Sequence, residues 1–202
     1  ALERLRATVA ARPDLAGKVT LRQGEACELS PLADASVDLV ILNSVVQYFP
    51  DLDYLLAVIR ESLRVCRPGG HLFLGDLRSL VLLPALHSWV TLQRADPTAP
   101  AAPLAAQIAQ AVADEEELTL DPALFEALAD LYPGLSRVEL APKLGGYDNE
   151  LSRYRYDVTL ALGPVRQSLA EPEIRIAATP DWRQRLAAAG TAAPRENRPI
   201  PI

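Results

Sequence analysis

Hydrophobic and polar positions along the first 76 residues follow the period of a helix in some stretches and of a strand in others. Apolar residues three or four positions apart, such as Leu55, Ile59 and Leu63, predict an amphipathic helix. The continuous apolar run Val37–Asn43 is typical of a strand covered on both faces. The predicted elements are a helix at Ala1–Arg12, strands at Val19–Arg22 and Val37–Asn43, a helix at Asp51–Val65, and a strand at His71–Asp76 after the turn Arg67–Gly70. Strands that alternate with helices favour an α/β fold with a parallel sheet.

The pattern changes after Asp76, where helical segments follow one another before two last strands. The expected helices are Ser79–Gln93, Pro103–Glu117 and Pro122–Tyr132, and the expected strands are Ser136–Ala141 and Tyr154–Leu162. Asp121 is the expected N-cap of the third helix, because Pro122 suits a first helical position. From Gly163 onward alanine, proline and charged residues dominate. This predicts one domain over residues 1–162 and a linker or tail over 163–202, with at most one short helix near Trp182–Ala189.

Composition narrows the classes of partner. The formal net charge of −6 argues against a nucleic-acid backbone as partner for the whole surface, although Arg153 and Arg155 could form a local basic patch. The most apolar windows, Val37–Tyr48 and Leu80–Leu92, are shorter than the roughly 20 residues that a membrane span needs. Neither nucleic acid nor a membrane is therefore expected as a partner.

The cysteines and the missing methionine bear on the protein's context. Cys27 and Cys66 lie in apolar segments without metal-ligand spacing, so small core residues are expected rather than a disulfide or a redox pair. Such thiols fit a reducing cytoplasm. The 202 residues contain no methionine and begin inside a predicted helix, so we expect an excerpt of a longer protein.

Polar residues follow two predicted strands, at the edge of an α/β sheet where ligands bind. The first group is Gly24, Glu25 and Ala26, in which a glycine admits a ligand to the backbone and a carboxylate can accept from an exocyclic amine. The second group begins with Asn43 and Ser44, directly after the apolar strand. Each group taken alone has another interpretation, a turn for the first and a helix cap for the second.

In this order, the segments resemble a known family. The succession GEA, VDLVILNSVVQYF and RPGGHLFLGD resembles class I methyltransferases that depend on S-adenosylmethionine (SAM). Five blocks, NSVVQYFPDLDYLL, GDLRS, LHSWVTLQRA, DEEELTLDPALF and YDNELSRYRYDVTL, are similar to the methyltransferase domains inserted in nonribosomal peptide synthetases and mixed peptide–polyketide assembly lines. The similarity runs from Ala1 to about Leu162.

The resemblance implies a Rossmann-like α/β fold with a final antiparallel pair of strands, and SAM as the cofactor. The cofactor-binding residues that it implies are Gly24, Glu25, Ala26, Asn43, Ser44, Val45, Gln47 and Tyr48. Glu25 and Ala26 would border the adenine, and residues 43–45 would line the pocket for the methionine and adenosine parts. Gln47 and Tyr48 would close that pocket.

The part of the site that binds the methyl acceptor needs side chains that help the acceptor atom to act as a nucleophile. Methyl transfer is an in-line displacement, so the acceptor must hold a free lone pair about 3 Å from the methyl carbon. An amine must be neutral and a carbon acceptor must first lose a proton, so a base near neutral pH helps either. The resemblance implies His87 as a catalytic residue, with Asn149 and Glu150 over the same pocket. A His87–Glu150 pair would orient the imidazole; the alternative is that His87 packs on a helix face and Glu150 is solvated.

Other residues have more ordinary expected roles. Phe49 is expected to belong to the core. The run Asp114–Glu117 is expected to be a solvated helix end, and no metal site is expected. Arg153, Tyr154 and Tyr156 either shape the acceptor channel or alternate across a strand.

The family's defining feature, a strand that ends in a glycine-rich loop, has no counterpart in this sequence. Neither Gly69–Gly70 nor Gly145–Gly146 both follows a buried strand and begins a helix, as that loop would. In the family's sheet order, 3-2-1-4-5-7-6, Val19–Arg22 would be strand three and Val37–Asn43 strand four, with a gap of roughly 14 Å between them. We therefore expect an exposed, apolar strand edge and no SAM binding by this excerpt alone. A marginal fold would form if strand three moved across to pair with strand four.

The function implied by the resemblance is transfer of a methyl group to the amine of a carrier-tethered aminoacyl or peptidyl substrate. YDNELSRYRYDV is similar to the N-methylating subgroup, which favours nitrogen over carbon. A non-catalytic scaffold, a domain recruited to epimerise the α-carbon, and C-methylation of a carrier-bound intermediate stay open as alternatives. The implied partners are the carrier-tethered substrate and neighbouring adenylation and carrier domains.

Overall fold

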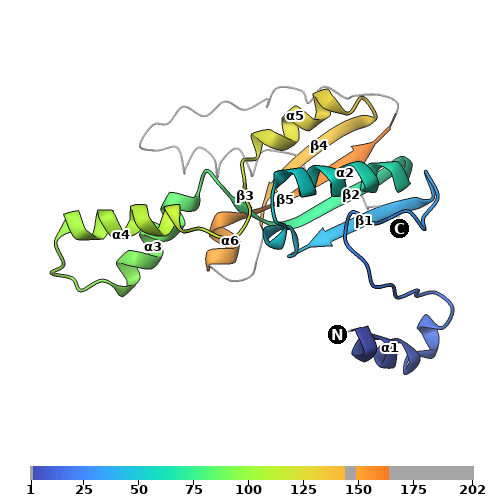
Figure 1. Ribbon diagram of the computed structural model, residues 1–202, viewed down its shortest axis with the longest axis horizontal. Coiled ribbons are helices and arrows are strands. Elements are labelled where there is room, and N and C mark those ends of the chain that lie inside the picture. The colour runs from blue at the N-terminus through green and yellow to red at the C-terminus, as the bar shows by residue number, and fades with distance from the viewer. Residues whose placement is uncertain (1, 144–148, 164–202) are drawn as a thin grey trace, which may run out of the picture. The chain divides into compact units, whose positions relative to one another are not determined.

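A computed structural model describes residues 2–143 and 149–163 (Figure 1). The chain divides into two units, Ala1–Arg166 and Gln167–Ile202, and every described residue belongs to the first. The predicted linker over 163–202 lies outside the described residues apart from Gly163. It stays a prediction, as does the short helix near Trp182–Ala189.

One mixed sheet organises the described residues (Figure 1). Its strands lie in the order β1-β2-β5-β4, where β1 is Val37–Asn43, β2 is Cys66–Ser79, β4 is Leu135–Pro142 and β5 is Arg155–Leu162. β1 runs parallel to β2, and β5 runs antiparallel to both β2 and β4. The short β3, Thr119–Leu120, pairs in parallel with the end of β2. This order is the 4-5-7-6 half of the implied sheet, so the predicted fold class is confirmed.

Helices and 3₁₀ turns connect these strands. They are α1 Leu2–Ala10, η1 Pro13–Leu15, η2 Val46–Tyr48, α2 Leu52–Val65, α3 Leu83–Arg94, α4 Ala101–Ala113, α5 Ala123–Leu131 and α6 Glu150–Tyr154. Before α2, Asp51 Oδ1 accepts a hydrogen bond from the Tyr54 N–H at 2.8 Å. Before α5, Asp121 Oδ1 accepts one from the Ala123 N–H at 2.9 Å, although the N-cap is Pro122 and the helix begins at Ala123, one residue later than predicted. These side chains satisfy backbone donors that the start of a helix leaves free.

The core lies where α2 and α5 cover the sheet (Figure 1). Leu55 and Ile59 of α2 and Phe125 of α5 are fully buried in one cluster with Leu72 of β2 and Leu160 of β5. The four-residue spacing on α2 places its apolar side chains on the face turned to the sheet. Each such side chain contributes about 1.5–3 kcal/mol by leaving water, so this layer holds the strands together.

The opposite face of β1 is open, which corrects one expectation. The apolar run predicted burial on both faces, but Leu39 and Ile41 are 48% and 58% exposed, whereas Val40 and Leu42 pack against the core. An apolar run shows only that its side chains suit burial, and a second layer must come from other elements. Among the described strands only β2 pairs with β1, so β1 is the exposed apolar edge that the strand-order argument predicted.

Val19–Arg22 forms no strand, which is a second correction. A strand needs a neighbour to pair with its backbone groups, and none of the described strands pairs with this segment. The later segment 29–34 is instead hydrogen-bonded to Arg64, near the end of α2. The guanidinium of Arg64 donates to the carbonyl oxygens of Leu29 and Leu32 and to the carboxylate of Asp34.

The observed boundaries differ from the predicted ones where a strand is longer than its apolar run. β2 includes the predicted turn Arg67–Gly70 and continues to Ser79, so α3 begins at Leu83 rather than Ser79. Helix α6 was not predicted, and it precedes β5. Phe49 packs against the core as expected.

Candidate active site

The carboxyl ends of β1 and β2 meet at one edge of the sheet, where Asn43 is opposite Gly75. The Ser44 N–H donates to the Gly75 carbonyl at 3.0 Å, and Asn43 Nδ2 donates to Ser44 Oγ at 3.2 Å. A β-carbon on Gly75 would stand 2.2 Å from Asn43 Oδ1 and 2.6 Å from Cε1 of Phe73. A larger residue at position 75 would therefore have to displace the Asn43 or Phe73 side chain. The sequence argument selected Asn43 and Ser44 but not Gly75.

Ser44 and Asp76 both adopt the left-handed backbone region, with φ angles of 58° and 67°. Residues other than glycine seldom do so, and such strained positions cluster at functional sites. The two residues are joined, because Ser44 Oγ donates to Asp76 Oδ2 at 2.9 Å. Asp76 also lies where the register between β2 and β5 shifts, and bulges of this kind redirect side chains beside active sites.

Asp76 is a buried carboxylate with two cationic partners. Its side chain is 8% exposed, Arg155 Nη1 lies 2.9 Å from Oδ2, and Lys143 Nζ lies 2.8 Å from Oδ1. The Asp76 N–H donates to Asp157 Oδ1 at 2.7 Å. Burial alone would raise the pKa of Asp76, but Lys143, Ser44 and Arg155 outweigh it and hold this pKa below its usual value. The carboxylate is therefore charged at neutral pH.

The 3₁₀ turn η2 continues from the end of β1 and carries the next predicted cofactor residues. Gln47 is 4% exposed, and its backbone carbonyl accepts from the Leu118 N–H at 2.9 Å. Gln47 Nε2 donates to the Ser44 carbonyl at 3.4 Å, whereas the buried Gln47 Oε1 has no partner among the described residues. Val45 and Tyr48 are 39% and 71% exposed. The turn therefore offers one unsatisfied acceptor and two exposed apolar surfaces.

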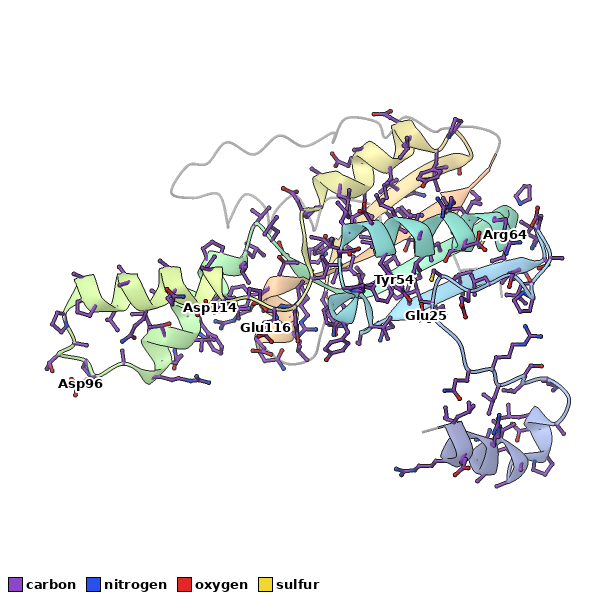
Figure 2. All side chains as sticks on the ribbon, viewed as in Figure 1. Glu25, Tyr54, Arg64, Asp96, Asp114 and Glu116 are labelled. Atoms are coloured by element: carbon purple, nitrogen blue, oxygen red, sulfur yellow. The ribbon has the colours of Figure 1, made fainter. Side chains whose placement is uncertain are left out.

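Gly24, Glu25 and Ala26 are attached to α2 by one hydrogen bond. The Ala26 N–H donates to the hydroxyl oxygen of Tyr54 at 3.2 Å, near the exposed Glu25 (Figure 2). The Tyr54 ring packs edge-on against Phe49 with 4.9 Å between centroids. Tyr54 and Phe49 thus connect the predicted cofactor residues 24–26 with those at the end of β1 and in η2.

A polar cavity of about 150 Å³ lies beside these strand ends. Its lining combines two arginines, two glutamates, a leucine and a tyrosine: Arg78, Leu86, Glu117, Glu150, Tyr154 and Arg155. Arg155 connects this cavity to the strand ends, since it also binds Asp76. Arg78 Nη1 donates to Glu117 Oε2 at 2.6 Å. Glu150 lines this cavity and is exposed, as the alternative interpretation of a solvated Glu150 predicted.

His87 is paired with Glu115, which corrects the expected pairing with Glu150. His87 Nε2 lies 3.2 Å from Glu115 Oε2, and Arg78 donates to both carboxylate oxygens of Glu115 at 3.0 and 2.8 Å. The prediction of a solvated helix end at Asp114–Glu117 is confirmed for the exposed Asp114 and Glu116 and wrong for Glu115, whose side chain is 13% exposed. Helix α4 stops at Ala113 and the following turn sends Glu115 inward, because Arg78 offers it a two-point ion pair.

The charge of Glu115 is stabilised by these neighbours. Burial alone would raise the pKa of Glu115. The Glu117 N–H, Arg78 and His87 lower it by more, so this pKa lies below its usual value. The carboxylate that orients His87 is therefore ionised at neutral pH.

Asn149 and Glu150 begin α6, between the last two strands. Asn149 Oδ1 accepts from the Leu151 and Ser152 N–H groups at 3.0 and 3.2 Å, and Ser152 Oγ accepts from the Asn149 N–H at 3.1 Å. This capping box occupies the Asn149 carboxamide oxygen. Tyr156, one of the alternatives for the acceptor channel, is buried core and donates its hydroxyl hydrogen to the Leu120 carbonyl.

Aromatic rings form a contact between α3 and α6. The Trp89 and Tyr154 ring centroids lie 6.3 Å apart, and the guanidinium of Arg153 stands 5.7 Å from the Trp89 centroid. Of the three residues considered for the acceptor channel, only Tyr154 lines the polar cavity.

Sequence reasoning missed the charged residues that organise the site. Arg78 and Glu115 are 37 positions apart and meet only in the folded chain. A signal was present in the block GDLRS, where Asp76 and Arg78 continue an otherwise apolar strand. Charged residues on a buried strand require partners, which is the reason to treat them as site candidates.

Comparison with known proteins finds methyltransferase domains and peptide synthetases. Residues 1–74 match the family described as "Methyltransferase domain". The chain is 46% identical over 156 residues to chondramide synthase of Chondromyces crocatus, an alignment that covers 77% of this chain and 4% of that protein. It is 37% identical over 183 residues to the beauvericin nonribosomal cyclodepsipeptide synthetase of Beauveria bassiana, which covers 90% of this chain and 6% of that one.

Among solved structures, a SAM-dependent methyltransferase from Aquifex aeolicus is similar with a TM-score of 0.43 and 13% sequence identity, covering 80% of this chain and 63% of that one. The fold assignment rests on the strand order, not on this likeness. With that strand order and the polar strand ends, the match over residues 1–74 makes this chain similar to methyltransferase domains. Its matched relatives include nonribosomal peptide synthetases, of whose length it spans only a small part. No helix within residues 2–143 or 149–163 is long and apolar enough to cross a membrane.

Proposed function

We propose that the protein to which this chain belongs transfers a methyl group from SAM to the amine of an aminoacyl or peptidyl group tethered to a carrier protein. The observation that carries this proposal is the polar cavity beside the strand ends, where Glu150 and Tyr154 form part of the wall, while Arg78 is paired with Glu117 and Arg155 with Asp76. Carboxylates and an aromatic ring attract an ammonium group before it is deprotonated. The matched synthetases, which by name assemble peptides and depsipeptides, support a substrate of this kind.

The residues at the end of β1 suit SAM as the cofactor. The orphaned Gln47 Oε1 would gain a hydrogen bond from an amino group of the cofactor. The exposed side chains of Val45 and Tyr48 offer apolar surface to a purine ring. We assign the cofactor side to Asn43, Ser44, Val45, Gln47 and Tyr48, with Gly24, Glu25 and Ala26 at the adenine end. When bound, SAM supplies an electrophilic methyl group on a sulfonium ion.

The acceptor amine needs only a modest base. An α-amino group has a pKa of about 7.7–8.0, so near neutral pH a sizeable fraction is already unprotonated. We assign His87 as the base, with Glu115 as the carboxylate that orients its ring. A neutral imidazole that donates from Nε2 to Glu115 leaves Nδ1 free to take a proton. We assign Glu150 to the binding of the amine and Asn149 to the start of α6.

Methyl transfer can be tested with isotope-labelled SAM and an aminoacyl thioester on the carrier of the complete protein. We expect hydrolysis to release an N-methyl amino acid that carries the label. A labelled α-methyl amino acid would instead indicate C-methylation, and an unlabelled but racemised amino acid would indicate epimerisation. Release of the unchanged amino acid would indicate a scaffold.

The role of His87 can be tested in the same assay. Replacing it, as His87→Gln, should lower the rate at saturating substrate by about 100-fold, the lower range for losing a general base. The other histidine offers a matched control, because His71 is exposed in the first half of β2, whereas His87 contacts Glu115, the partner of the cavity-lining Arg78. We expect His71→Gln to retain the wild-type rate. Equal rates for both variants would remove His87 from the mechanism.

We further place the protein in the cytoplasm, with neighbouring adenylation and carrier domains as its partners. Cys27 and Cys66 both carry free thiols, which suits a reducing compartment. Aminoacyl thioesters are delivered by a carrier, so a methyltransferase that acts on them must lie within reach of that carrier's arm.

A further inference from the structure

Asp76 connects the two sides of the candidate site through a single oxygen atom. Oδ2 accepts from Ser44 Oγ at 2.9 Å and from Arg155 Nη1 at 2.9 Å. Ser44 belongs to the proposed cofactor side, at the end of β1. Arg155 lines the polar cavity on the proposed acceptor side. A shift of Asp76 therefore moves a group on each side.

The surroundings of Asp76 make this connection rigid. Its N–H is bound to Asp157, its Oδ1 to Lys143, and the residue is 6% exposed. A buried carboxylate that contacts two cations holds both in place, because leaving either one unpaired inside the protein is costly. The left-handed backbone of Ser44 and Asp76 persists because these bonds over-determine it.

We propose that Asp76 is a positioning residue that couples the cofactor side of the site to its acceptor side, an inference that rests on the proposed function. When the cofactor settles against Ser44, the shared carboxylate fixes Arg155 and hence the wall of the acceptor cavity. Binding on one side then strengthens binding on the other, and by thermodynamic linkage the effect is reciprocal. Asp76 itself need not touch either ligand.

The test is a binding cycle on the complete protein with S-adenosylhomocysteine, which carries no transferable methyl group, and an aminoacyl carrier. In the wild type, we expect S-adenosylhomocysteine to tighten aminoacyl-carrier binding by a factor of roughly 5–150. In Asp76→Asn, which keeps the shape and removes the charge, this factor should fall to near one. The control is Asp96→Asn, an exposed residue between α3 and α4 whose carboxylate binds Thr98 (Figure 2).

A second variant separates coupling from a failure to fold. Ser44→Ala removes one bond to Asp76 and leaves both ion pairs intact, so it should also abolish the coupling while circular dichroism shows that the protein stays folded. Coupling that survives in a folded Asp76→Asn or Ser44→Ala protein would overturn the inference and leave methyl transfer standing. A wild type that transfers methyl groups without any coupling would also overturn it. Absence of methyl transfer and of binding in the wild type would refute the proposed function, and the inference with it.

Discussion

Residues at the carboxyl ends of β1 and β2 are constrained by close contacts and by unusual backbone angles. Asn43 Oδ1 and the Phe73 ring close on Gly75 from two sides, and Ser44 and Asp76 hold left-handed backbone angles that their mutual hydrogen bond stabilises. The residue types at Asn43 and Ser44 could be predicted as site candidates, because polar groups follow an apolar strand. The need for Gly75 could not, since it arises from the pairing of β1 with β2.

Replacing Gly75 with alanine should test this packing. The added β-carbon would meet Asn43 Oδ1 at 2.2 Å, so we expect Gly75→Ala to lower the free energy of unfolding by about 1–3 kcal/mol, as overpacking does. Gly134→Ala is the matched control, because nothing lies within 4 Å of its added carbon. Urea unfolding of both variants measures the difference. Equal losses for the two would contradict the packing argument.

Glu115 should make stability depend on pH. Burial raises its pKa but the Glu117 N–H, Arg78 and His87 lower it by more, so the folded-state pKa lies below the unfolded value of about 4.3. Such a group stabilises the fold above that value and loses its contribution as pH falls through the folded pKa. The loss of unfolding free energy in Glu115→Gln should therefore be largest above about pH 5 and shrink below about pH 4.

Urea unfolding between pH 7 and pH 3 measures this dependence. The exposed neighbour gives the control, since Glu116→Gln should change stability little at any pH (Figure 2). A Glu115→Gln deficit that stays constant across this range would show that the Arg78 pair does not depend on the ionised carboxylate.

The helices and strands show which elements the spacing of apolar residues is enough to predict. Helix α2 lies where its apolar spacing and the Asp51 cap predicted, because both signals are local. The strand predicted at Val19–Arg22 is absent, and α6 was not predicted, because pairing partners and the capping box at Asn149 depend on context. The burial of β1 depends in the same way on which layers cover it.

A pair of isoleucines tests the one-sided burial of β1. Ile59 on α2 is fully buried, whereas Ile41 on β1 is 58% exposed. In this chain, we expect Ile59→Ala to cost about 2–5 kcal/mol of unfolding free energy, and Ile41→Ala to cost less than about 1 kcal/mol, the range of strand propensity. Denaturant titration measures both. A cost for Ile41→Ala as large as that for Ile59→Ala would mean that β1 is covered on both faces.

For the whole molecule, the described residues supply one side of the proposed cofactor site. Asn43, Val45 and Tyr48 are exposed, and β1 is an edge of the described sheet. Ligand pockets bury most of their ligand's surface, and one exposed wall cannot do so. The complete protein and this 202-residue chain can therefore differ in cofactor affinity.

Calorimetric titration of this 202-residue chain with SAM should show no binding in the micromolar range, which would require about −8 kcal/mol. The chain's melting temperature should likewise stay unchanged at millimolar SAM, since a ligand that binds the folded state raises it. A micromolar dissociation constant would refute the prediction and would mean that the exposed residues are covered when SAM binds.

The sequence by itself determined the α/β class, the main helix α2, the polar strand ends at Asn43 and Ser44, and the resemblance to methyltransferase domains, because these are carried by local periodicity and by motif order. Only the tertiary structure decided that His87 is paired with Glu115, that Arg78 organises that pair, and that one oxygen of Asp76 joins Ser44 to Arg155. The physical reason is that a charged side chain is stabilised by whichever partner the fold brings within a few ångströms, and that partner can lie anywhere along the chain.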